Sequence, residues 1–138
     1  MPPDLRQLSH HHPLSQPIDI DCAWDAIHFV LANGETDLED FPSTFLYCGG
    51  TPVGDIDVGY GPAQAFRPAD VASIAGLLES IGEDAFSTRF DHERMQAQGT
   101  YRMDGERDED HEYVLDHYRA LRDFVIAAAR KGDGLFVT

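Results

Sequence analysis

The chain has 138 residues, of which 42% are hydrophobic and 10% aromatic; this composition excludes a disordered chain and fits one globular domain. Asp and Glu number 25 against 10 Lys and Arg, which gives a net charge of −15 at pH 7, so nucleic acid or an anionic membrane would be repelled. No window approaches the about 18 consecutive apolar residues of a membrane-spanning helix.

The N-terminal segment is the least regular part of the sequence. Residues 1–17 combine prolines with polar residues and three consecutive histidines, which predicts a flexible or irregular segment. A compact domain is expected to follow over residues 18–138. His10, His11 and His12 could bind a transition metal, but a short tract flanked by prolines is usually incidental, and we expect no metal site.

The sequence favours a cytoplasmic protein. The first residues lack the apolar core of a signal peptide. Cys22 and Cys48 form no metal-binding pattern, and a reducing compartment would keep them as thiols. We therefore expect both cysteines to be small buried residues.

The first clear helix is expected within IDIDCAWDAIHFVLANG, residues 18–34. Asp19 or Asp21 can cap its start, because a carboxylate oxygen satisfies backbone N–H groups of the first turn. The apolar run STFLYCGG, residues 43–50, is expected to be a short buried strand. One stripe of side chains recurs along the helix at helical spacing: Ile20, Trp24, Ile27, His28 and Leu31.

The second half of the chain predicts mostly helices. One helix begins at Pro68, which has no N–H to leave unbonded in a first turn, and Gly82 follows its end. Residues 83–99 predict one or two short helices. The longest helix is expected over residues 108–131, with acids in its first turn and bases in its last turn, as the helix dipole prefers.

Two further strands complete the predicted fold. Short apolar segments at residues 63–66 and 134–138 can both join a sheet. With the helices, they predict an α+β protein: a single compact domain with a small mixed sheet and several packed helices.

The glycine-rich stretch GGTPVGDIDVGYGPAQ, residues 49–64, is the segment most like a binding loop. Gly49 and Gly54 have the spacing of a phosphate-binding loop, but Asp55 follows where that motif needs lysine. GYGPAQ departs from the dinucleotide-binding pattern at its last position, and no helix opens directly after it. We therefore expect no phosphate site. The glycines and prolines instead predict a rigid edge that can bound a pocket or a contact surface.

Several segments occur in an order and spacing that resemble a known family. They are IDIDCAWDAIHFVL, GGTPVG, DVGYGPAQAFRPADVASIAGLL, FDHERM and the C-terminal KGDGLFVT. Together they span residues 18–138 and are similar to the DUF1877, or YfbM-like, family of small bacterial and phage proteins. The resemblance implies a single α+β domain, and it implies no activity, cofactor or catalytic residue.

The chain departs from this family pattern in two places. Family members usually begin with an apolar strand and an acidic helix, whereas this chain has a shorter segment rich in histidine and proline, so an edge of the sheet could be missing or differently built. Members also tend to have serine or threonine before the proline of the second clear helix, where this chain has Arg67, a poor cap.

Two groups of side chains are candidates for chemistry. Trp24 and His28 lie four residues apart on the first helix and face the same way. His28 could act as an acid, a base or a ligand, or it could be a core residue that binds a backbone carbonyl. Asp25 lies on another face and is expected to be solvated. His111 and His117, six residues apart on the long helix, do not suit a two-histidine metal site.

The first functional hypothesis is a non-enzymatic protein-binding module without a cofactor. The charge of −15 would attract a partner protein with a basic surface, although acidity also favours solubility alone. One form of such a module is an immunity protein that neutralises a cognate bacterial toxin by covering its basic cleft. No direct nucleic-acid partner is expected.

The alternative is a small enzyme or ligand-binding protein with a pocket between the first clear helix and the glycine-rich stretch. Trp24, His28, Tyr47 and Tyr60 would line this pocket. The surface or pocket of either hypothesis is expected to use one set of residues: Trp24, His28, Tyr47, Gly49, Gly50, Asp55, Asp57 and Tyr60.

Overall fold

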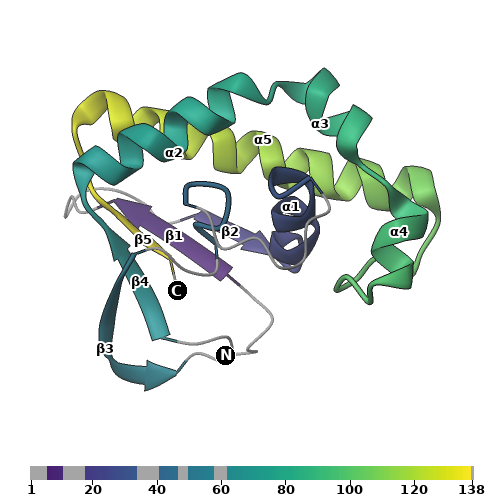
Figure 1. The fold of residues 1–138 in the computed structure, drawn as a ribbon, viewed down its shortest axis with the longest axis horizontal. Helices are drawn as coiled ribbons and strands as arrows, with labels where there is room; N and C mark the ends of the chain where they lie inside the picture. Colours follow the sequence, from purple (N-terminus) through teal and green to yellow (C-terminus); the bar gives the residue numbers. More distant parts are fainter. Residues whose placement is uncertain (1–5, 11–17, 34–40, 47–49, 58–61, 138) are drawn as a thin grey trace.

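The computed structural model describes residues 6–10, 18–33, 41–46, 50–57 and 62–137. The described chain forms one sheet with helices packed against it, as the predicted single α+β domain requires (Figure 1). Its elements in chain order are β1 (Arg6–His10), β2 (Ile18–Asp21), α1 (Trp24–Leu31), β3 (Thr51–Asp57), β4 (Pro62–Phe66), α2 (Pro68–Ser80), α3 (Glu83–Arg89), α4 (His92–Ala97), α5 (Arg107–Lys131) and β5 (Leu135–Val137).

The five strands of the sheet lie in the order β2-β1-β5-β4-β3. Every pairing among the described strands is antiparallel, so the expected mixed sheet is wrong. The last strand, β5, lies at the centre between β1 and β4, and β2 and β3 form the two edges. The C-terminal strand thus joins two antiparallel pairs, β1–β2 and β3–β4, into one sheet.

Strand β1 corrects the prediction of a flexible or irregular segment over residues 1–17. Residues 6–10 form an inner strand of the sheet, while residues 1–5 and 11–17 lie outside the described chain. Leu8 accounts for the strand, because its side chain is fully buried. It pairs with Ile18 of β2 on one side and with Val137 of β5 on the other. A single apolar residue among polar neighbours has no periodic pattern, so local sequence carries little sign of a strand here.

Strand β2 corrects the start of the first helix. Alternate side chains of a strand point to opposite faces, and Ile20 is fully buried while Asp19 is exposed. The helix α1 begins only at Trp24, and its N-cap residue makes no side-chain hydrogen bond. Capping by Asp19 or Asp21 is therefore wrong, since both aspartates belong to the strand.

The apolar run over residues 43–50 is not a strand in the part that the structure describes. Residues 41–46 form turns, residues 47–49 lie outside the described chain, and β3 begins at Thr51. Phe45 is nevertheless fully buried, and its ring meets the ring of Phe66 edge-on at 6.3 Å between centroids. A short apolar run thus predicts burial more surely than it predicts a strand.

The helices of the second half are confirmed. Two short helices, α3 and α4, follow α2, and α5 covers the predicted long helix within one residue. Gly132 ends α5 in the left-handed conformation with a φ of 70°. No helix in the described chain is long and apolar enough to cross a membrane. The inner stripe of α5 is fully buried, as predicted: Val114, Tyr118, Leu121, Val125 and Ala128.

Side chains of α5 satisfy the carbonyl groups at the end of α2, beside which α5 runs (Figure 1). The Tyr118 hydroxyl donates to the carbonyl oxygen of Ile81 at 2.6 Å and lies 3.4 Å from that of Leu78. Arg122 Nε donates to the Leu78 carbonyl at 2.8 Å. The Leu78 carbonyl also accepts from the backbone N–H of Ile81 at 3.2 Å, and α5 supplies the side-chain donors for both carbonyls at this helix end. Burial raises the pKa of Tyr118 to about 12.

Removing the Tyr118 hydroxyl should therefore destabilise the fold. We expect Tyr118→Phe to lower the free energy of unfolding by about 1–3 kcal/mol, because it leaves a buried carbonyl without its donor. Urea denaturation would measure the loss. The matched control is Ser80→Ala, which removes an exposed hydroxyl that donates to the carbonyl of Leu77 at 2.6 Å at the same end of α2. A loss no larger than that of the control would contradict the carbonyl-capping role.

Candidate functional site

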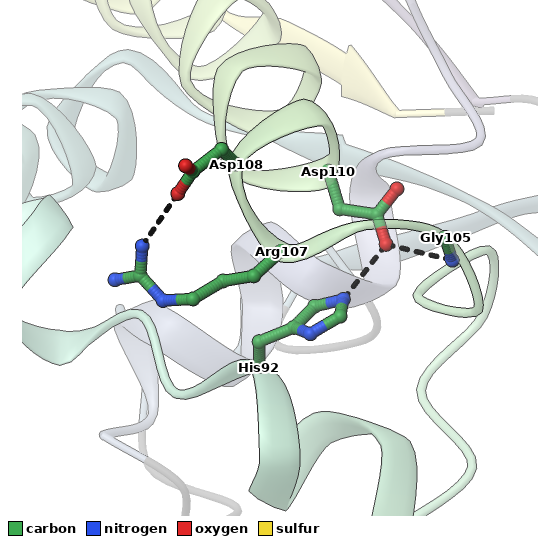
Figure 2. A network of polar contacts seen from close by, with 5 residues as sticks. All are labelled: His92, Gly105, Arg107, Asp108 and Asp110. Atoms are coloured by element: carbon green, nitrogen blue, oxygen red, sulfur yellow. Dashed lines mark hydrogen bonds and ion pairs between the residues drawn. The ribbon is translucent and has the colours of Figure 1, made fainter.

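Three segments meet at the first turn of α5: the helix itself, α4, and the loop over residues 99–106 (Figure 2). Oδ2 of Asp110 accepts a hydrogen bond from Nε2 of His92 at 2.8 Å and another from the backbone N–H of Gly105 at 3.0 Å. The side chains of His92 and Asp110 are only 9% and 14% exposed. One buried carboxylate thus ties both α4 and the loop to α5.

The contact with Asp110 also fixes the orientation of the His92 ring. A carboxylate can only accept, so Nε2 of His92 is the donor. Asp91 places the ring, because its side chain caps α4 by accepting from the Arg94 N–H at 3.1 Å. His92 is therefore held in one orientation at the first position of α4.

A second histidine lies next to Asp110 in the chain. Nε2 of His111 and Oγ of Ser87 are hydrogen-bonded at 2.8 Å. Phe90 contacts both histidine rings: it meets His111 edge-on at 5.0 Å and lies nearly parallel to His92 at 6.2 Å. Ser87 lies inside α3, where the backbone N–H groups that could bind an oxyanion are used by the helix. The Ser87–His111 pair therefore joins α3 to α5 and is not a nucleophilic site.

A cleft of about 510 Å³, which we call the α4 cleft, opens beside His92. Within the described residues, no group of three His, Cys, Asp or Glu side chains could hold a metal ion. The wall of the cleft contains acidic, basic and aromatic groups. It is lined by Thr88, Phe90, Asp91, His92, Glu93 and Arg107.

The predicted residues of α1 are largely internal. Trp24 is 2% exposed in the hydrophobic core, so it does not line an open pocket. His28 is half-buried, and burial lowers its pKa while the charge of Asp25 opposes that shift. The expectation that Asp25 is solvated is wrong, because its Oδ2 accepts from the backbone N–H of Tyr101 at 2.9 Å. The core interpretation of this helix face therefore fits Trp24.

The glycine-rich stretch is mostly a hairpin of β3 and β4, not a long loop. A Cβ atom on Gly50 would lie 2.8 Å from the carbonyl oxygen of Ala65, so this glycine permits a close approach to β4. Asp55 and Asp57 belong to the edge strand β3. The other predicted site residues, Tyr47, Gly49 and Tyr60, lie outside the described chain, and a role for them stays a prediction.

Sequence reasoning missed the contact between His92 and Asp110. The two residues are 18 positions apart and belong to different helices, so no local spacing joins them. One signal was present: Asp91 precedes a helical segment, and an aspartate there predicts a capped helix start. That signal places His92 in a first turn, but only the packing of α4 on α5 supplies its partner.

The fold and these contacts define a small single-domain α+β protein. The chain belongs to the DUF1877 family, described as a domain of unknown function, whose profile matches residues 3–138. It is also similar to the crystal structure of YfbM, a protein of unknown function from Escherichia coli. The TM-score is 0.70 and the identity 14%, over 96% of this chain and 98% of that chain. No curated protein matches significantly. The resemblance found in the sequence is thus confirmed for family and fold.

Loss of the Asp110 carboxylate should destabilise the fold. We expect Asp110→Ala to lower the free energy of unfolding by about 1–3 kcal/mol, because a buried imidazole and a backbone N–H lose their acceptor. Asp108→Ala is the matched control in the same helical turn, since Asp108 is 93% exposed and binds only the exposed Arg107 among the described residues (Figure 2). Urea denaturation should show little change for the control. Equal losses would contradict a specific role for the His92–Asp110 contact.

The lowered pKa of His28 predicts a stability that depends on pH. The unfolded chain takes up a proton at the ordinary pKa of 6.5, whereas the folded chain takes it up only at lower pH. The contribution of neutral His28 to the free energy of unfolding is therefore fully present above pH 6.5. It is lost as the pH falls through 6.5 toward the lowered pKa. Urea denaturation between about pH 7.5 and about pH 5.5 would measure this loss.

Two variants separate His28 from other titrating groups. His28→Gln should reduce the loss of stability on acidification, because the titrating group is absent. Asp25→Asn should enlarge it, because the Asp25 charge raises the pKa of His28 in the folded chain. An unchanged pH dependence in His28→Gln would show that burial of this histidine does not control acid stability.

Proposed function

We propose that this chain is an acidic protein-binding module that receives a basic surface of a partner protein. The observation that carries the proposal is the distribution of charge along the chain. Residues 7–66 contain nine Asp and Glu and no Lys or Arg, whereas residues 67–138 contain nine of the ten basic residues. A uniform need for solubility would not separate the charges in this way.

The fold converts this separation along the chain into a separation between elements. Residues 7–66 supply β2, α1, β3, β4 and nearly all of β1, and residues 67–138 supply four helices and β5. Both edge strands of the sheet carry two aspartates, Asp19 and Asp21 on β2 and Asp55 and Asp57 on β3. Among the described residues, the strands and α1 thus carry acids with Arg6 as their one base, whereas the helices α2 to α5 carry acids and bases together. Strands with unbalanced acids favour a partner of opposite charge.

The partner in this proposal is a protein with a basic cleft or face. Opposite charge accelerates encounter and selects among partners, and the attraction weakens as salt screens it. A toxin with a basic cleft is one such partner, and the chain would then act as its immunity protein by occluding that cleft. The charge and the small size of the chain support this particular role.

Affinity capture from the source cells tests the proposal. The tagged chain would be used at about 50 mM and at about 500 mM salt, and bound proteins would be identified by mass spectrometry. We expect a basic protein in stoichiometric amount at low salt and much less of it at high salt. Capture that is indifferent to salt would contradict binding through charge.

Two variants with equal loss of charge locate the binding side. Asp19→Asn, Asp21→Asn, Asp55→Asn and Asp57→Asn together neutralise the edge strands and should reduce capture. The control neutralises four exposed acids of the helical half: Glu79→Gln, Glu106→Gln, Glu109→Gln and Glu112→Gln. Equal loss of capture in both variants would show that the partner is attracted by net charge alone and not by the aspartates of the edge strands.

A further inference from the structure

Residues 91–106, which we call the strap, are attached to the fold differently from the other helical parts. The strap contains α4 and the loop that leads to α5, and Figure 1 shows α4 beside the start of α5, away from β3 and β4. The helix α2 runs along α5, whereas none of the described helices and strands packs extensively against α4. A helix of six residues has little stability of its own, so the position of the strap depends on its contacts with the rest of the chain.

Two carboxylates outside the strap accept hydrogen bonds from it. Oδ2 of Asp110 on α5 accepts from Nε2 of His92 at 2.8 Å and from the backbone N–H of Gly105 at 3.0 Å (Figure 2). Oδ2 of Asp25 on α1 accepts from the backbone N–H of Tyr101 at 2.9 Å. The two carboxylates therefore hold the strap at its start, inside its loop and at its end.

The loop of the strap contains a strained residue. Arg102 has a φ of 65°, in the left-handed region that favours glycine. A residue with a side chain persists in this conformation only where its surroundings hold it there. Release of the strap allows Arg102 to return to a negative φ, so the strain favours opening.

The position seen in the structure, which we call closed, hides apolar side chains. Met95 and Met103 of the strap are buried. The guanidinium carbon of Arg94 lies 5.8 Å from the centre of the Phe29 ring on α1, and Phe29 is buried as well. Opening of the strap would expose both methionines and uncover Phe29, so burial of these side chains favours the closed position.

We propose that the strap opens as one unit while the sheet, α2 and α5 stay folded, and that Asp110 and Asp25 are the latches that keep it closed against the strain at Arg102. Local opening of this kind costs less free energy than unfolding of the whole chain. It would present an apolar surface without loss of the core. The inference goes beyond the proposed function, because the strap contains none of the aspartates of the edge strands.

Backbone hydrogen exchange of the full chain, followed by NMR at several low urea concentrations, tests the inference. The probes in the strap are the amides of Met95, Thr100, Tyr101 and Gly105, each of which donates a hydrogen bond. The reference is the set of amides in the buried part of α5. We expect the strap amides to share one protection factor, to exchange about tenfold or more faster than the reference, and to respond weakly to urea, because local opening exposes little surface.

Variants of the two latches test whether the strap opens as one unit. Asp110→Ala should accelerate exchange of the Tyr101 N–H about tenfold, although the acceptor of that N–H is Asp25. Asp25→Ala should likewise accelerate exchange of the Gly105 N–H, whose acceptor is Asp110. These crossed effects require a cooperative opening, and either variant alone reports it if the other does not fold.

Two further variants separate strain and charge from the latches. Arg102→Gly should slow exchange of the strap amides about threefold, because glycine adopts a positive φ without strain. The matched control for charge is Asp108→Ala, which removes a 93% exposed carboxylate in the same turn as Asp110 and should leave exchange in the strap unchanged. Equal acceleration by Asp108→Ala and Asp110→Ala would contradict the latch.

Three other results would overturn the inference. The first is equal exchange and equal urea dependence in the strap and in α5, which would mean that the strap opens only when the whole chain unfolds. The second is acceleration confined to the amide whose own acceptor is removed, which would mean separate fraying. The third is unchanged or faster exchange in Arg102→Gly, which would mean that no strain opposes the closed position.

Discussion

Burial of one face of α5 is the interaction on which the other elements depend. The stripe from Val114 to Ala128 is fully buried, and α5 packs against α1, α2, α3 and β2. The same helix then supplies polar contacts in three directions: to the end of α2 through Tyr118, to α3 through His111 and to α4 through Asp110. The apolar face of α5 packs against the neighbouring elements, and the polar residues beside that face form specific hydrogen bonds with α2, α3 and α4.

The predictable part of the fold follows from this same face. A stripe repeated over 25 residues defines both period and orientation, so the sequence predicts α5 and the neighbouring α2 closely. Strands β1 and β2 have five and four residues, too few for a period to appear, and their burial comes from partners distant in sequence. Leu8 is buried because β5 lies beside it, and nothing in residues 1–17 indicates that contact.

For the candidate site too, the sequence predicts composition and local helix faces, but it does not predict contacts between residues that are distant in the chain. Charge is a property of composition, and the acidic balance follows from the amino-acid counts alone. The placement of four aspartates on the two edge strands depends on the strand order, because β2 and β3 become edges only when β5 lies between β1 and β4. The orientation of the His92 ring depends on the contact with Asp110, which joins two helices. Trp24, by contrast, lies on the predicted helix face but serves the core.

The central proposal is that the edge strands β2 and β3, with their four aspartates, form the surface that meets a partner. Backbone hydrogen exchange of the chain, alone and with the captured protein, tests this claim most directly, since binding slows exchange at the covered surface. The account predicts slower exchange in residues 18–21 and 51–57, the two edge strands, with α5 unchanged. Slower exchange confined to α2, α3, α4 and α5 would contradict it.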